Sequence, residues 1–274
     1  ADNLGNRIAY TLDLAGNRTQ EQVFDPANAL AQTRSRVYSS INRLFQELGA
    51  LNQTTEYTDD PEGNVLTVKD PLNHTTSNQY DRRNRLKQVT DPASGVVQYT
   101  YNGLSALTSV KDPRNLTTTY ALDGLGNMST QVSPDTGTTT NTYDPAGNLA
   151  TQTDAKGQAT SYAYDALNRV TMITFHDGAK QVYAYDLGTN GLGRLSSIAE
   201  TNPALQVTSL IAYGYDQKGR VTSETRTVNG VASALAYSYD SSGRLTGMTY
   251  PSGRTVTYTL DALGRVSQVT TTKD

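Results

Sequence analysis

The chain has 274 residues, with 23 Lys and Arg against 26 Asp and Glu, 18 Tyr and no Cys. This balance, with no basic run, argues against nucleic-acid binding, and the lack of Cys excludes disulfides and thiolate metal sites. No apolar run approaches the roughly 18 residues of a membrane span. Leu, Ile, Val and Phe are scarce enough, at about 19%, to suggest disorder. The net charge of −3 and the many tyrosines argue against it.

The chain opens with two copies of one phrase, Asp2-Asn3-Leu4-Gly5-Asn6-Arg7-Ile8 and Leu12-Asp13-Leu14-Ala15-Gly16-Asn17-Arg18. The first copy begins in mid-unit, so we expect the chain to be cut from a longer protein. The next interval, from Asp13 to Ser39, predicts a longer hairpin loop around residues 25–30. A short helix is the alternative in this region, because Ile41, Leu44, Phe45 and Leu48 have helical spacing.

From Ser39 onward a turn-forming residue returns every 21 residues. The positions are Ser39, Asp60, Asp81, Asn102, Asp123, Asp144, Asp165 and Asp186. A period held this strictly indicates a tandem array of one supersecondary unit. We therefore expect residues 1–274 to form a single repeat array without a separate toxin or protease domain.

Each unit has the composition of two strands and two turns. Asp144-Pro145-Ala146-Gly147 suits a tight turn with a bulge, and the runs between turns are rich in Thr, Val, Tyr and Leu. A second turn follows about ten residues later, as at Asp91 and Asp154. Bulky residues alternate before the turn, as at Tyr162 and Tyr164, so they share one face. The pattern predicts an all-β antiparallel meander of about 24 strands.

After Asp186 the register slips. The next interval, to Asp216, is 30 residues and predicts an extended turn over residues 187–193 and a longer hairpin around residues 202–205. The interval from Asp216 to Asp240 is 24 residues, with Asn229-Gly230 as the predicted hairpin tip.

Tyr-Asp followed by Gly-Asn or Asn-Arg and an aliphatic residue, at this period, resembles the YD repeat of Rhs proteins, teneurins and the C component of Tc toxin complexes. The resemblance implies a β-strip that curls or spirals into a hollow shell, often around a toxic C-terminal domain. The residues that carry this structural signature are Tyr80, Asp81, Tyr143, Asp144, Gly147, Tyr164, Asp165, Arg169, Tyr185, Asp186, Tyr215, Asp216, Gly219, Tyr239, Asp240, Gly243, Asp261 and Gly264.

The resemblance implies a non-enzymatic segment of a bacterial shell, secreted or at the cell surface, whose partners are the rest of the parent chain and its toxin cargo. About 24 strands at ~4.8 Å spacing give only a turn or two of such a spiral. Two alternatives remain open. One is a binding module that grips glycans or proteins through its Tyr face, and the other is a fibre that self-associates through its edge strands.

Other candidate chemistry is weaker, and we expect no cofactor, metal or catalytic residue. Asp135-Thr136-Gly137 matches the aspartic-protease tripeptide but has no second copy. His74 and His176 lie in predicted turns, and the repeated Asp side chains lack calcium-loop spacing. The Arg residues after each turn are interpreted as contacts within the sheet, with Arg169 stacking on Tyr164.

Overall fold

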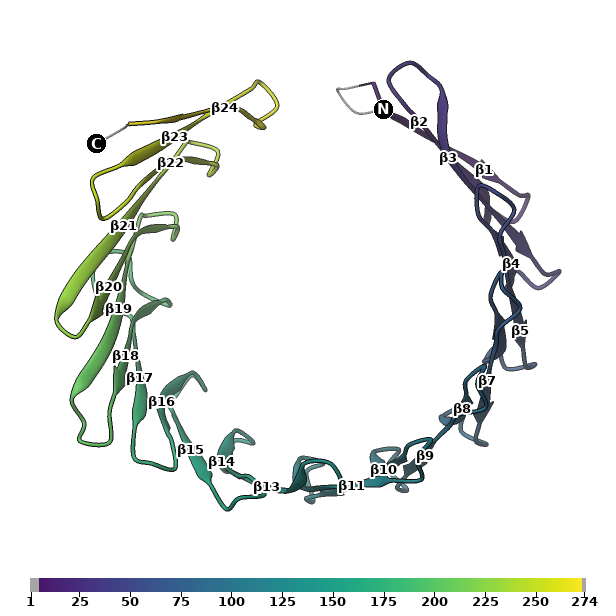
Figure 1. The fold of residues 1–274 in the computed structure, drawn as a ribbon, viewed down its shortest axis with the longest axis horizontal. Coiled ribbons are helices and arrows are strands. Elements are labelled where there is room, and N and C mark those ends of the chain that lie inside the picture. The colour runs from purple at the N-terminus through teal and green to yellow at the C-terminus, as the bar shows by residue number, and fades with distance from the viewer. Residues whose placement is uncertain (1–4, 273–274) are drawn as a thin grey trace. The chain divides into compact units, whose positions relative to one another are not determined.

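The computed structural model describes residues 5–272, which form 24 strands and no helix. Figure 1 shows the chain as a succession of short strands joined by tight turns. The predicted all-β meander is confirmed. Residues 2–4, where the first copy of the repeated phrase begins, lie outside the described residues.

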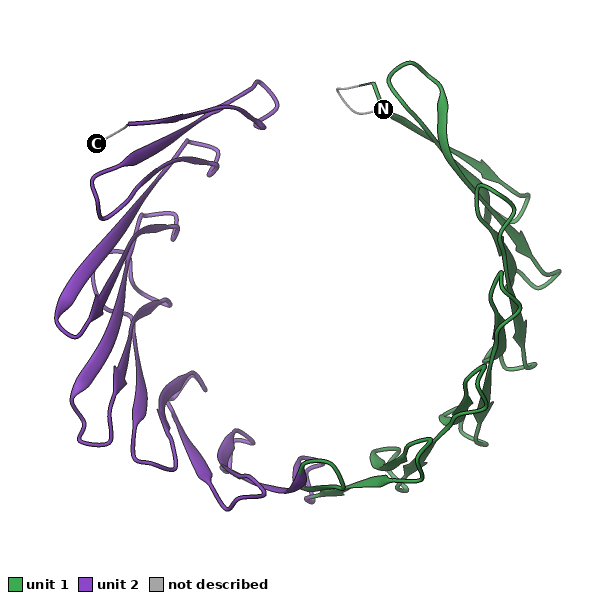
Figure 2. Cartoon of the chain, in the orientation of Figure 1, with its two compact units in different colours: residues 1–122, 131–136 green, residues 123–130, 137–274 purple. Residues whose placement is uncertain are grey.

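The chain divides into two compact units (Figure 2). Unit 1 comprises residues 1–122 and 131–136, and unit 2 comprises residues 123–130 and 137–274. The strands that lie wholly in unit 1 are β1 (Arg7–Leu12), β2 (Arg18–Phe24), β3 (Leu30–Tyr38), β4 (Leu44–Leu48), β5 (Thr54–Asp59), β6 (Val65–Lys69), β7 (Thr75–Tyr80), β8 (Leu86–Thr90), β9 (Val96–Tyr101), β10 (Leu107–Lys111) and β11 (Thr117–Leu122).

Strand β12 (Met128–Ser133) has residues in both units. The strands of unit 2 are β13 (Gly137–Tyr143), β14 (Leu149–Thr153), β15 (Ala159–Tyr164), β16 (Val170–Thr174), β17 (Lys180–Tyr185), β18 (Leu195–Thr201), β19 (Val207–Tyr215), β20 (Val221–Val228), β21 (Val231–Tyr239), β22 (Leu245–Thr249), β23 (Thr255–Leu260) and β24 (Val266–Thr271).

Within each unit every strand pairs antiparallel with the strand that follows it in the sequence. The pairing runs without interruption from β1 to β11 in unit 1. It runs from β13 to β24 in unit 2. Neighbouring strands therefore cover each other's N–H and C=O groups along each unit.

A regular repeat consists of two five-residue turns, one five-residue strand and one six-residue strand. The turns that open repeats, such as the one at residues 81–85, are called corners below. After each regular corner the register shifts by one residue: Ala163 pairs with Met172, whereas Tyr164 pairs with Val170. Thr171 is the extra residue of this β-bulge, which bends the strand next to the corner.

The long interval between Asp13 and Ser39 has a different cause from the one predicted. Its hairpin turn keeps the ordinary five residues, closed by a 2.9 Å hydrogen bond from Asp25 N to Ala29 O. The extra residues extend β2 to seven residues and β3 to nine. The predictions of a longer loop and of a helix are both wrong, because longer strands add ladder hydrogen bonds whereas a longer loop adds none.

The other irregular intervals follow the prediction. The extended turn is closed by a hydrogen bond from Asp186 N to Arg194 O at 3.0 Å, and the hairpin of β18 and β19 is longer than a regular one. Asn229 and Gly230 form the tip between β20 and β21, with φ values of 49° and 82°. Two successive positive φ values are typical of the two-residue turn that Asn-Gly favours.

The strands between residues 5 and 272 enclose no hydrophobic core. No hydrophobic side chain is buried within the described residues, and the residues that are buried are Asn141, Gly191, Ser196, Ser209 and Gly247. Both faces of a single layer are open to solvent, so backbone pairing and contacts along the sheet must stabilise it. No helix in the described part of the chain is long and apolar enough to cross a membrane.

Candidate functional site

The corner at Asp165 shows how the repeated aspartates shape the chain. Asp165 Oδ1 accepts hydrogen bonds from the backbone N–H groups of Leu167 at 2.9 Å and Arg169 at 3.0 Å. The backbone closes the same turn from Asp165 N to Arg169 O at 3.0 Å. Asn168 has a φ of 60°, a conformation that Gly and Asn tolerate. The carboxylate therefore holds the turn from inside.

The other corners repeat this arrangement. The N–H four residues on donates to Oδ1 of Asp13, Asp60, Asp81, Asp123, Asp144, Asp216, Asp240 and Asp261. Gly147, Gly219, Gly243 and Gly264 occupy the positive-φ position of their corners. These predicted signature residues lie in the turns where the repeat pattern placed them.

Arg169 joins its own corner to the next one. Its Nε donates to Asp165 Oδ2 at 2.7 Å and its Nη2 to Asp186 Oδ2 at 2.6 Å. Its guanidinium lies 4.3 Å from the ring centroid of Tyr185. The predicted stacking of Arg169 on Tyr164 is therefore wrong. Tyr164 leans toward the preceding repeat, because its hydroxyl donates to the carbonyl of Leu149 at 3.0 Å.

We call this arrangement the repeat clasp: a corner carboxylate, the Arg four residues on, and the Tyr of the next repeat. Arg85 over Tyr101 and Arg220 over Tyr239 repeat it, both at 4.7 Å. The Tyr hydroxyl in turn donates to a carbonyl of the preceding repeat at Tyr80, Tyr101, Tyr143, Tyr164, Tyr185, Tyr215 and Tyr239. Each clasp fastens one repeat to the next.

Sequence reasoning identified the members of the clasp but missed its direction. In the regular repeats the stacked ring lies 16 residues after the Arg, as from Arg85 to Tyr101 and from Arg169 to Tyr185. This constant forward spacing was readable in the sequence. Spacing alone did not show whether the guanidinium reaches forward or back.

The clasp favours the charged form of its carboxylates. The side-chain hydrogen bond from Arg85 is the main cause that lowers the pKa of Asp81 to about 2. Backbone hydrogen bonding from Arg169 lowers the pKa of Asp165 from its ordinary value. The bonds to Asp186 and Asp165 raise the pKa of Arg169. Desolvation raises the pKa of Tyr164, which favours the protonated hydroxyl that donates to the carbonyl of Leu149.

We expect the clasps to weaken in acid. A carboxyl whose pKa is lowered on folding stabilises the fold above its ordinary pKa of about 3.9, and the stabilisation is lost as pH falls through the folded value. For Asp81 this window runs from about pH 4 to about pH 2. Thermal unfolding followed by circular dichroism should show a midpoint that falls across this window, and Asp81→Asn should reduce the slope.

The corner at Asn102 shows that an Asn can replace the corner Asp without loss of the turn, as Asp81→Asn requires. Its amide oxygen already holds a corner, accepting from Leu104 N at 2.9 Å and Ala106 N at 3.0 Å. Asp81→Asn should therefore keep the turn while removing only the anionic acceptor of Arg85. If the unfolding midpoint changed equally with pH in the variant and the parent, Asp81 would not be a source of the acid sensitivity.

The residues weighed for catalysis occupy separate turns. Asp135 is in the turn before β13, 59% exposed, and pairs with Arg114 at 2.8 Å. His74 contacts Asp70, Nδ1 to Oδ2 at 3.0 Å, and is 57% exposed. His176 is exposed in the turn between β16 and β17. Among the described residues no three His, Asp or Glu side chains gather as a metal site would require.

Comparison with known proteins agrees with the geometry. The model of the RHS repeat matches residues 60–96, 80–114, 101–138, 143–180 and 239–274, which together make up more than half of the chain. The chain belongs to the RHS repeat family. The predicted YD-repeat identity is thus confirmed. Residues 181–238 fall outside these RHS matches, and they contain the extended turn and the longer strands β18 to β21.

Among solved structures, this RHS chain resembles a chain of TcdB2-TccC3-TEV with a TM-score of 0.53 and 18% identity, over 97% of this chain and 17% of that one. The comparison with TcdB2-TccC3-Cdc42 gives a TM-score of 0.41 and 17% identity, over 97% of this chain and 19% of that one. The comparison with the Tc holotoxin pore of Photorhabdus luminescens gives a TM-score of 0.41 and 17% identity, over 96% of this chain and 18% of that one. The chain thus spans less than a fifth of each. No curated protein matches it by sequence.

Proposed function

We propose that the chain is a non-enzymatic wall segment of an Rhs-type shell, which encloses a C-terminal toxin and helps to deliver it. In this proposal the parent protein is secreted or lies at the cell surface. Its partners are the remaining parts of the parent chain and the toxin cargo.

The observation that carries the proposal is a single-layer sheet, without a buried hydrophobic side chain in the described residues, in which each repeat pairs with the next and three junctions also carry the clasp. Such a layer serves a wall because its cohesion comes from neighbouring repeats, and both of its faces stay accessible. The fold likeness to a TcdB2-TccC3-TEV chain supports it, and so does that chain's much greater length.

The Tyr face offers less support for a glycan-binding module. The hydroxyl groups of Tyr164 and Tyr185 already donate to carbonyls of the preceding repeat, and the Tyr185 ring already lies against Arg169. These polar and aromatic groups are used within the sheet. Self-association has a clearer basis, because within residues 5–272 β1 pairs only with β2 and β24 only with β23. In the wall proposal, further strands of the parent chain cover those edges.

Protease protection in the parent polypeptide tests the proposal. The segment that follows the repeats should resist a non-specific protease in the wild type. It should be digested when one residue is inserted after Thr151, which breaks the sheet. A matched insertion at the Asn229-Gly230 tip should preserve the protection. Digestion at one rate in all three proteins would refute enclosure.

A further inference from the structure

Asp59 stands where most repeats have a tyrosine. The residue just before a corner is Tyr at positions 38, 80, 101, 143, 164, 185, 215 and 239, and Leu at positions 12, 122 and 260. Asp59 is the one charged residue at this position in the array. It belongs to β5 and precedes the corner at Asp60.

The tyrosine fills a defined place between two repeats. At Tyr101 the ring lies 4.7 Å from the guanidinium of Arg85, and the hydroxyl donates to the carbonyl of Leu86 at 2.8 Å. The equivalent groups facing Asp59 are the guanidinium of Arg43 and the carbonyl of Leu44. An aspartate side chain is too short to fill a ring's place, and its ionised carboxylate cannot donate to a carbonyl.

Although the ring is missing, the Arg43 side chain extends to the next corner as the clasp arginines do. Its Nη1 donates to the carbonyl of Asp60 at 2.5 Å, as Arg85 Nη1 donates to the carbonyl of Asn102 at 3.1 Å. Its own corner carries Ser39 in place of Asp, and Ser39 Oγ accepts only the backbone N–H of Arg43, at 3.2 Å. The guanidinium therefore lacks both its usual carboxylate and its usual ring.

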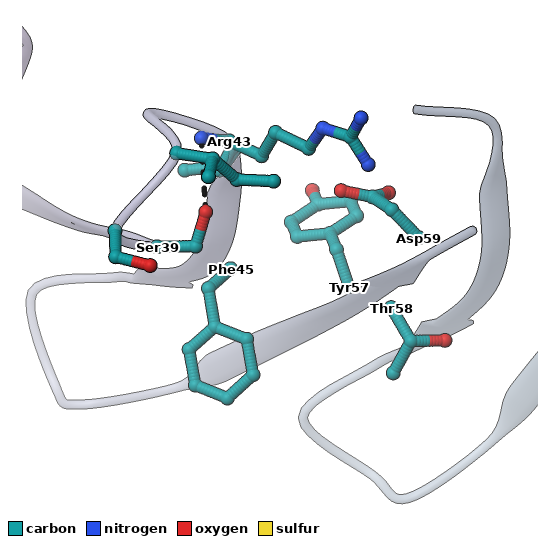
Figure 3. A pocket seen from close by; sticks show the side chains of 9 residues that line it. Ser39, Arg43, Phe45, Tyr57, Thr58 and Asp59 are labelled. Atoms are coloured by element: carbon teal, nitrogen blue, oxygen red, sulfur yellow. Dashed lines mark hydrogen bonds between the residues drawn. The ribbon is translucent and has the colours of Figure 1, made fainter. Parts of the chain in front are cut away.

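A hollow lies where the ring is missing. Two adjoining pockets, of about 370 and 350 Å³, share Arg43, Leu44, Tyr57 and Asp59 in their linings. Figure 3 shows Arg43, Tyr57 and Asp59 around the first of them. The half-buried carboxylate of Asp59 forms no hydrogen bond or ion pair within residues 5–272. Small-molecule sites have volumes from roughly 300 Å³ upward, with a few convergent polar groups.

The polar groups lie at opposite ends of this space. Asp59 starts from the backbone position of the missing tyrosine, so its carboxylate lies at the root of the absent ring. The carbonyl of Leu44 corresponds to the group that receives the hydroxyl at the far end. At Tyr101 the guanidinium of Arg85 lies over the ring face between these two ends, and Arg43 is its counterpart here. A ring substituted at para positions would span both ends.

We propose that this hollow binds a small para-hydroxyphenyl amine. Its ring takes the place of the absent tyrosine ring against the guanidinium of Arg43. Its hydroxyl donates to the carbonyl of Leu44, and its ammonium group pairs with the carboxylate of Asp59. The site is separate from the wall function, because it depends on Asp59 in place of a tyrosine and not on the pairing of neighbouring strands.

Calorimetric titration of the 274-residue chain with tyramine tests the proposal. Tyramine should bind with one site per chain. Asp59→Tyr restores the ring of the other repeats and should weaken tyramine binding at least about tenfold, which is about 1.4 kcal/mol. Phenethylamine, which lacks the hydroxyl, and p-cresol, which lacks the amine, should each bind more weakly than tyramine. The absence of tyramine binding, or equal binding by Asp59→Tyr, would overturn the proposal.

Two further variants keep the test decisive if Asp59→Tyr disturbs the fold. Asp59→Asn preserves the shape of the hollow and removes its charge, so tyramine should bind more weakly while p-cresol binds as before. Tyr101→Asp should open a second vacancy beneath Arg85 and raise the stoichiometry to about two. An Asp59→Asn protein with unchanged preference for tyramine over p-cresol would contradict the ion pair with Asp59.

Discussion

Insertion of one alanine between Thr151 and Gln152 is expected to destabilise unit 2 strongly. Side chains alternate between the faces of a strand, so the insertion turns the following residues of β14 to the opposite face. Gln152 would leave Asn141, which is buried at 8% exposure and accepts its amide hydrogen bond at 3.3 Å. Because the insertion disturbs the pairing of β14 with both β13 and β15, we expect the free energy of unfolding to fall by on the order of 3 kcal/mol or more.

The control is the same insertion between Asn229 and Gly230. Both residues are exposed at the tip of a hairpin, and a three-residue loop is a common alternative to a two-residue one. The insertion there should lower the free energy of unfolding by less than about 1 kcal/mol. Urea unfolding followed by far-UV circular dichroism measures both variants. Similar losses at the two sites would show that the strand assignment of residues 149–153 is wrong.

The second large effect is expected at Gly219. Its φ of 81° lies in the left-handed region, and an added Cβ would come within 2.1 Å of Arg194 Nη2. Gly219→Ala should therefore incur backbone strain of about 1–2 kcal/mol. It should also displace Arg194 from the Tyr215 ring, 5.7 Å away, at a further cost of about 0.5–1 kcal/mol.

Gly147 separates these two contributions. Its φ of 87° resembles that of Gly219, but an added Cβ would meet no atom within 4 Å. Gly147→Ala should thus show the backbone strain alone in the same urea experiment. In an Arg194→Ala background the excess cost of Gly219→Ala should vanish. An excess that persists in that background would mean that the Arg194 side chain is not what restricts the position.

The corners and the order of strands were predictable from the sequence because their causes are local. An Asp at a corner accepts the N–H four residues on, as Asp144 does from Asn148 at 2.8 Å, and Gly147 supplies the positive φ. These interactions need only the five residues of the turn. Repetition every 21 residues then makes each strand pair with the next.

Strand length was less predictable. The extra residues between Asp13 and Ser39 extend β2 and β3, although the pattern around Asp25 suggested a longer loop. Nothing within the interval distinguishes a residue that extends a strand from one that enlarges a turn. Pairing with the neighbouring strands decides it, since that pairing satisfies the additional backbone groups.

The sequence by itself determined the repeat, the turns, the all-β meander and the identity of the residues at each corner, because each depends on contacts within a few residues. Only the tertiary structure decided that Arg169 reaches forward to Tyr185 and Asp186, and that Asp59 leaves a hollow beneath Arg43. Both depend on how one repeat lies against the next. Packing between neighbouring repeats sets the direction in which these side chains point. The spacing of residues along the sequence does not reveal that direction.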